Sequence, residues 1–185
     1  MPKNIHKELE YAILTMPQKD KDKLLLRLIA KNNILIEQLN FQLLEDVSDL
    51  SLKREELKTL ILRVSKMHHD TPGWMMMDMR DLNGRITKHV KVTKDKYGEV
   101  ELTLYMLNVF FQNQLPLLET FNRRSETISE YLAKRTEFLM KKLTAMNEEY
   151  YIEFYDDVNK LLTCIHKYCT AGHARQLNIV KSWEY

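Results

Sequence analysis

The chain has 185 residues, of which 44% are hydrophobic and 29% are charged, and its formal net charge is +2. This length and composition suit one all-helical domain of residues 1–185 with a sizeable core, and the near-balanced charge gives no general indication of nucleic-acid binding. Glycine and proline number only four each, too few for the closely spaced turns of a β-sandwich, so the composition favours helices over strands.

Signals for export and membrane insertion are not recognised. The first ten residues, MPKNIHKELE, lack the apolar core of a secretory signal, and no apolar run approaches the about 18 residues of a membrane span. The two cysteines, Cys164 and Cys169, stand five residues apart in a helical pattern. That spacing separates them by roughly 8 Å, beyond disulfide reach. A reduced, cytoplasmic protein without a membrane segment is therefore expected.

Apolar residues recur at helical spacing in the first part of the chain. Three short stripes precede a polar break at EDVSD, residues 45–49, and a fourth stripe covers residues 57–67. The three short stripes comprise Ile5, Leu9, Ile13 and Met16, then Leu25, Leu28 and Ile29, then Ile36, Leu39 and Leu43. Each stripe predicts one helix with an apolar side.

A methionine-rich helix is predicted after Thr71-Pro72, a pair typical of an N-cap followed by proline in the first turn. Its core side repeats at intervals of three and four residues: Met75, Met79, Leu82, Ile86 and Val90. Trp74 and Met77 fall outside this stripe. They belong either to a helix start that is buried all round or to an exposed patch that binds a partner. Copper binding by the thioethers is less favoured, because no further cluster of soft ligands repeats the pattern.

The opposite side of this helix is basic. Residues 80–96 contain six Lys or Arg against two acids, a net charge of +4. The candidate partner-binding residues of this basic face are Arg80, Arg85, Lys88, Lys91 and Lys94. Such a face suits an acidic protein surface or a phosphate backbone.

The segment around KDKYG, residues 94–98, allows two interpretations. HVKVTKDKYGEVELTLYML alternates like two strands around a turn, which would make residues 88–105 a hairpin. Helical spacing fits Val100, Leu104 and Leu107 at least as well, and a hairpin without a partner sheet is only marginally stable. A helix is therefore the preferred interpretation.

Two further stripes follow, one over residues 116–146 that includes Phe121, and one over residues 151–165 that ends before Gly172. The chain is thus predicted to be all-α, an irregular bundle of about seven or eight helices. Because no clean internal repeat is found, a short α-solenoid-like stack of helix pairs is the second choice.

An acidic segment at residues 147–160 is the counterpart of the basic face. It has a net charge of −4, and its tyrosines interleave at helical spacing. Its acidic residues are Glu148, Glu149, Glu153, Asp156 and Asp157. The segment predicts either a solvated acidic face over an aromatic core or a surface that meets the basic face, within the molecule or between copies.

The most metal-like set is His166, Cys169 and His173 in the sequence CIHKYCTAGH. Spacings of three and four residues would align the three side chains on one side of an unbroken helix, and three such ligands plus water is a known zinc arrangement. No fourth ligand is evident, however, and Gly172 is a candidate helix end. Core packing is therefore preferred, and no cofactor is expected.

Catalytic motifs are not recognised. The four glycines stand alone, which excludes Walker and dinucleotide-binding loops. Neither G-x-S-x-G, H-E-x-x-H nor paired Glu-x-x-His occurs. An enzyme is therefore not expected.

Two stretches, DKDKLLLRLIAKNNILIEQLNFQLLED and LNGRITKHVKVTKDKYGEVELTLYML, resemble uncharacterised all-helical bacterial proteins. The resemblance implies an all-helical fold and carries no particular activity or site.

Three functional hypotheses follow from these patterns. The first is a non-enzymatic helical interaction or adaptor protein that uses the basic face (80–96) and the acidic face (147–160), with an unknown protein partner or by self-association. The second is a nucleic-acid-binding protein that tracks phosphates with the basic helix. The third is a metal-binding helical protein.

Overall fold

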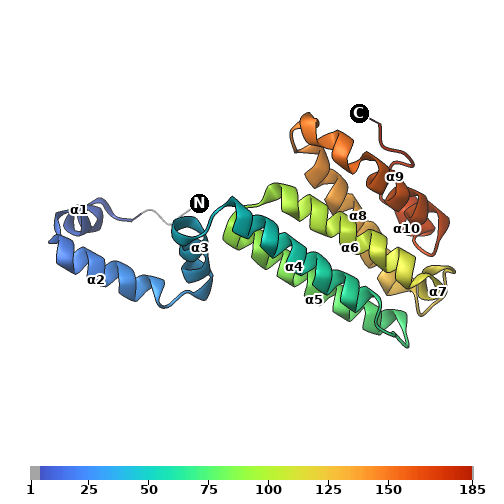
Figure 1. The fold of residues 1–185 in the computed structure, drawn as a ribbon, viewed down its shortest axis with the longest axis horizontal. Helices are drawn as coiled ribbons and strands as arrows, with labels where there is room; N and C mark the ends of the chain where they lie inside the picture. The colour runs from blue at the N-terminus through green and yellow to red at the C-terminus, as the bar shows by residue number, and fades with distance from the viewer. Residues whose placement is uncertain (1–4, 185) are drawn as a thin grey trace. The chain divides into compact units, whose positions relative to one another are not determined.

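The structure, a computed structural model, describes residues 5–184 and contains ten α-helices and one short 3-10 helix there, with no strand (Figure 1). Eight of these α-helices have nine residues or more, whereas α7 has four and α10 has six. The all-α fold and the number of main helices are thereby confirmed. In chain order the elements are α1 (Lys7–Thr15), α2 (Gln18–Ile29), α3 (Asn33–Leu44), α4 (Val47–Ser65), α5 (Pro72–Thr93), α6 (Lys96–Asn113), α7 (Leu115–Leu118), α8 (Glu126–Thr144), η1 (Glu148–Tyr150), α9 (Tyr151–Lys167) and α10 (Ala171–Gln176).

The chain forms two compact units, Met1–Glu45 and Asp46–Tyr185. The division falls in the polar EDVSD stretch, where Asp46 caps α4. Its carboxylate accepts hydrogen bonds from the N–H of Ser48 (2.7 Å) and of Asp49 (3.3 Å), and the Asp49 carboxylate accepts one from the N–H of Asp46. Single-domain behaviour over residues 1–185 stays a prediction, because two compact units can still unfold together.

The first unit consists of α1, α2 and α3, and none of these helices contains a buried residue. Pro17 is the N-cap of α2, and the Asn32 side chain caps α3 by accepting a hydrogen bond from the N–H of Leu35. The sequence thus defines where α2 and α3 begin, but the apolar stripes of the three helices remain at least partly exposed.

The second unit is built around α6, which contacts α4, α5, α8 and α9. Figure 1 shows α6 running between the α4–α5 pair on one side and α8 with α9 on the other. Eleven residues of α6 are buried. Met106, Leu107 and Phe110 of this helix have no exposed surface, and neither do Met75 and Met79 of α5. These side chains form the centre of the hydrophobic core.

The methionine stretch divides between core and surface. Met75 and Met79 are fully buried, as their place on the predicted stripe requires. Trp74 is 62% exposed and Met77 is 57% exposed. Of the two interpretations of this stretch, the helix start buried all round is therefore wrong for these two residues.

The structure decides between the two interpretations of KDKYG. Helix α5 ends at Thr93 and α6 begins at Lys96, so only Lys94 and Asp95 separate them. Lys94 has a φ of 60°, the left-handed conformation common at helix ends. The preferred helical interpretation is confirmed and the hairpin alternative is wrong.

The helix predicted over residues 116–146 is interrupted at residues 119–125. There the Asn122 side chain accepts hydrogen bonds from the N–H of Arg124 and of Ser125, and the Ser125 hydroxyl donates to the carbonyl of Thr120. Such local bonds give the backbone an alternative to the helix. As a result Phe121, placed on the core stripe by the sequence, is 58% exposed.

Candidate functional site

The outer face of α5 combines exposed apolar and basic side chains. The helix begins where the Thr71 hydroxyl accepts a hydrogen bond from the N–H of Trp74, with Pro72 in the first turn. Its inner stripe packs into the core, which leaves Trp74, Met77, Gly84, Lys88 and Lys91 exposed on the opposite side. We call these five residues the α5 outer face. Gly84 follows Met77 by seven residues and Lys91 follows Gly84 by seven. Seven residues are about two helical turns, so the three residues form one line along the helix.

All five predicted basic-face residues are exposed, and some have neighbours within the chain. Arg85 forms an ion pair with Asp81, with 2.8 Å between Nε and Oδ2. The Arg80 guanidinium lies 5.6 Å from the centre of the Tyr131 ring. Arg80 is thereby engaged by α8.

Gly84 lies in the middle of this outer face without a packing reason inside the chain. A Cβ added at Gly84 would meet no atom within 4 Å. Glycine in a helix interior costs about 1 kcal/mol relative to alanine. Close approach of another backbone is a common reason to retain a glycine in such a place.

The predicted acidic face lies on η1 and α9. All five of its acidic residues are exposed, while Phe154 and Val158 of the same segment are buried beneath them. Glu153 accepts a hydrogen bond from the Tyr97 hydroxyl at 2.7 Å. Burial, together with this bond to Glu153, raises the pKa of Tyr97 well above its usual range. Ile152, which is 69% exposed, adds an apolar group to the acidic face.

The basic and acidic faces lie on helices with different neighbours. Helix α5 contacts α4, α6 and α8, whereas α9 contacts α6, α8, α10 and η1. Figure 1 places α5 and α9 at opposite sides of α6. The ion pair of Arg85 and the hydrogen bond of Glu153 likewise go to residues outside the opposite face. Each face is therefore a separate surface of the second unit.

A buried ion-pair network, which the sequence pattern did not predict, joins α4 to the start of α6. Arg54 of α4 binds the Asp95 carboxylate through two bonds, Nε to Oδ2 at 2.6 Å and Nη2 to Oδ1 at 2.8 Å. The N–H of Gly98 donates to Oδ1 at 2.8 Å, and Nε2 of His89 lies 3.2 Å from Oδ2. The Asp95 side chain is only 4% exposed. The guanidinium of Arg54 also lies 4.8 Å from the centre of the Tyr97 ring.

Burial of Asp95 on its own raises the pKa of this carboxyl, but the bonds from His89, Arg54 and the Gly98 N–H lower the pKa more strongly, to about 2. The carboxylate is therefore ionised throughout the neutral range and fixes the α5–α6 turn. An aspartate three residues before Gly98 is a recognisable N-cap signal. Its pairing with Arg54, 41 residues earlier, is a tertiary contact that no local pattern reveals.

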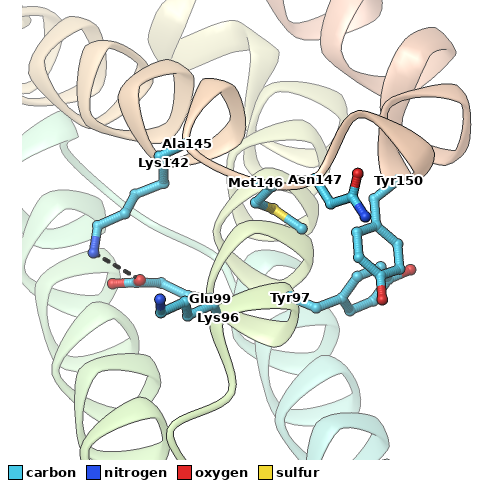
Figure 2. Close-up of a pocket in the computed structure, with 8 residues that line it drawn as sticks. All are labelled: Lys96, Tyr97, Glu99, Lys142, Ala145, Met146, Asn147 and Tyr150. Carbon is cyan, nitrogen blue, oxygen red and sulfur yellow. Dashed lines mark ion pairs between the residues drawn. The ribbon is translucent and has the colours of Figure 1, made fainter.

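A pocket of about 530 Å³ lies beside this network, between the start of α6 and the end of α8 with η1. Figure 2 shows its lining, with Lys142 directed at Glu99. The two charges form an ion pair of 2.9 Å, so the lysine is already engaged. Tyr97 and Tyr150 meet edge to face on the other side of the pocket, with 5.4 Å between ring centres. The eight lining residues include no histidine, cysteine or serine.

The three metal-like residues do not form a site. Helix α9 ends at Lys167, and His173 belongs to the separate helix α10, so the unbroken helix that would align them is absent. Nε2 of His166 lies 3.1 Å from the carbonyl oxygens of Ile179 and of Val180. Cys169 is 2% exposed. Across residues 5–184, no three His, Cys, Asp or Glu side chains are grouped so that they could hold a metal ion.

Within the described part of the chain no helix combines the length and apolarity needed to cross a bilayer. Comparison of the chain with protein-family models, with curated proteins and with solved structures finds no match.

Proposed function

We propose that this chain is a non-enzymatic helical interaction protein that binds an acidic, amphipathic segment of a partner protein on its α5 outer face. The observation that carries the proposal is the exposure of Trp74 and Met77, 62% and 57%, on the same side of α5 as Lys88 and Lys91. An apolar centre beside charged residues is the usual layout of a protein–protein interface.

The residue types suit this role. Tryptophan is among the residues that contribute most to binding when an interface covers them. The flexible thioether of Met77 adapts to differently shaped apolar partners. Gly84 follows Met77 by two helical turns on the same line along α5. It supports the proposal because its missing side chain lets a partner helix approach the α5 backbone.

Charge complementarity selects an acidic partner. Lys88 and Lys91 lie about one and two turns beyond Gly84 on the outer face. Opposite charges across an interface speed association and fix its register. The acidic face at residues 147–160 gives the protein a second surface of opposite sign, so we propose an adaptor with two separate docking sides. Its two free cysteines, Cys164 and Cys169, agree with the cytoplasmic location that we propose for it.

Nucleic-acid binding is the second candidate, and the same lysines support it, since they could contact phosphates. We favour a protein partner for two reasons. Asp81 on the exposed side of α5 neutralises Arg85, and the whole chain is only weakly basic, with a net charge of +2.

The test measures binding of two fluorescently labelled probes to the full-length protein by anisotropy. One probe is a peptide with the sequence of the chain's own acidic segment, NEEYYIEFYDDVNK (residues 147–160), chosen because it is acidic and amphipathic. The other probe is a single-stranded oligonucleotide of similar length. We expect the peptide to bind, and the double variant Lys88→Glu, Lys91→Glu to weaken that binding by about tenfold or more, because two attractions become repulsions.

The matched control reverses two lysines elsewhere. Lys134 and Lys141 on α8 have side chains that are 60% and 71% exposed. The variant Lys134→Glu, Lys141→Glu should bind the peptide as the unaltered protein does. If both variants bound the peptide equally weakly, the effect would come from the total charge of the protein and not from the α5 outer face. Tighter binding of the oligonucleotide than of the peptide would favour the nucleic-acid hypothesis.

A further inference from the structure

The pocket between the start of α6 and the end of α8 has a charged end and an aromatic end (Figure 2). The charged end holds Lys96, Glu99 and Lys142, and the aromatic end holds the rings of Tyr97 and Tyr150. Its volume of about 530 Å³ lies within the range of about 300–1,000 Å³ that is usual for small-molecule sites. This layout suits a small molecule that has a flat apolar body at one end and a charged group at the other.

The aromatic end is an apolar wall that is held in place from behind. The Tyr97 ring meets the ring of Phe154 with 5.2 Å between centres, and the Tyr97 hydroxyl donates to Glu153 at 2.7 Å. The Arg54 guanidinium lies 4.8 Å from the centre of the same ring. Met146 also lines the pocket and adds a thioether that adapts to apolar shapes. A wall fixed in this way needs little reordering when it packs against an aromatic ligand, which favours binding.

The charged end selects an anionic group. Two lysines and one glutamate line the pocket, which gives the lining a net charge of +1. The Glu99 carboxylate, 14% exposed, is already neutralised by its ion pair with Lys142. Lys96 is exposed, and its ammonium has no ion-pair partner among residues 5–184. Lys96 can therefore form a charge-assisted hydrogen bond with an anionic group of a ligand.

We propose that this pocket binds a small aromatic carboxylate, with the ring against Tyr97 and Tyr150 and the carboxylate on Lys96. Glu148 and Glu149 directly precede Tyr150 in the chain and do not line the pocket. Their charges repel an anionic group from the aromatic end and so favour this orientation. The proposal concerns a different surface from the α5 outer face and does not depend on the proposed function.

The experiment titrates the isotope-labelled full-length protein with three naphthalene compounds at neutral pH and follows binding by NMR chemical-shift changes. The compounds share one ring system and carry a carboxylate, a neutral carboxamide or a methylammonium group. We expect naphthalene-2-carboxylate to bind with a dissociation constant of about 0.1–1 mM, as is ordinary for a ligand of about a dozen non-hydrogen atoms. The carboxamide should bind about fivefold more weakly, and the ammonium compound more weakly still, because only the carboxylate pairs with Lys96.

Two substitutions locate the bound compound. Lys96→Gln should weaken binding of the carboxylate about fivefold and leave binding of the carboxamide unchanged, because it removes only the charge contact. Tyr150→Ala should weaken both compounds about fivefold or more, because it removes one ring of the aromatic end. Tyr150 is 41% exposed, so its loss leaves the core in place. Circular dichroism of each variant checks that the helices are retained.

Two control variants alter charges outside the pocket. Lys94 is exposed, two positions before Lys96, and does not line the pocket, so Lys94→Gln should bind the carboxylate as the unaltered protein does. Lys88→Glu, Lys91→Glu should also leave this binding unchanged, which separates the outcome from the test of the α5 outer face.

Three results would overturn the proposal. The first is no binding of the carboxylate at millimolar concentration. The second is equal affinity of the carboxylate for the unaltered protein, Lys96→Gln and Tyr150→Ala, because the compound would then lie elsewhere on the protein. The third is binding of the carboxamide or the ammonium compound as tightly as the carboxylate, because the pocket would then not select an anion.

Discussion

Two glycines in neighbouring helices should respond to the same substitution with opposite signs. Gly98 is packed under the Asp95 carboxylate, where an added Cβ would overlap Oδ2, come within 2.7 Å of Cγ and lie 3.0 Å from Nε of Arg54. Gly98→Ala therefore displaces Asp95 from its bonds to Arg54 and to the backbone. Gly84→Ala adds the same methyl group to α5, where it would meet no atom within 4 Å.

The expected free energies follow from these surroundings. Disrupting a buried ion pair costs about 3–5 kcal/mol, and the helix propensity of alanine returns about 1 kcal/mol. Gly98→Ala should thus lower the free energy of unfolding by about 2–4 kcal/mol. Gly84→Ala gains the helix propensity of alanine without disturbing a neighbour, so it should raise the free energy of unfolding by about 0.5–1 kcal/mol.

Thermal unfolding followed by circular dichroism measures both changes. At about 3 °C per kcal/mol for a chain of this size, Gly98→Ala should melt roughly 6–12 °C lower and Gly84→Ala roughly 1.5–3 °C higher. If Gly98→Ala were as stable as the unaltered protein, the Arg54–Asp95 network would not be what fixes the start of α6.

Three further predictions concern the same residues and the cysteines. The pKa of Asp95 is about 2 in the folded protein against an ordinary 3.8. The ionised carboxylate therefore contributes about 2 kcal/mol to the free energy of unfolding above pH 4, and this contribution is lost as the pH falls toward 2. Stability measured as a function of pH should show this loss in the unaltered protein and not in Asp95→Asn. Burial raises the pKa of the Cys164 and Cys169 thiols, so a thiol reagent at pH 7 should label both slowly in native protein and quickly in denaturant. Gly84→Ala should weaken binding of the acidic peptide severalfold while raising stability, and unchanged affinity would remove Gly84 from the proposed interface.

Local sequence signals predicted the helices well. Thr71-Pro72 marks the start of α5, and the stripe beginning at Met75 and Met79 faces the core as its spacing requires. These predictions succeed because capping and periodicity depend on residues within a few positions of one another.

Tertiary contacts decided what the local patterns could not. In the sequence Asp95 is one acid within a basic segment, and its bond to Arg54 of α4 is a tertiary contact. The break at residues 119–125 depends on hydrogen bonds that compete with helix formation: the Asn122 side chain accepts one from the N–H of Arg124, and the Ser125 hydroxyl donates one to the carbonyl of Thr120. The stripes of the first unit are those of a core, and yet none of their described members is buried within the chain. Periodicity predicts which side of a helix is apolar, and it does not identify what covers that side.

Trp74 offers the most direct test of the proposed interaction surface. The chain has two tryptophans, and Trp183 is 6% exposed whereas Trp74 is 62% exposed. In the variant Trp183→Phe, emission reports on Trp74 alone. Titration with the acidic peptide should shift this emission to shorter wavelength, because binding removes the indole from water, and Lys88→Glu, Lys91→Glu should abolish the shift. Peptide binding without any change in Trp74 emission, or no binding at millimolar peptide, would contradict the proposal that the α5 outer face receives an acidic partner.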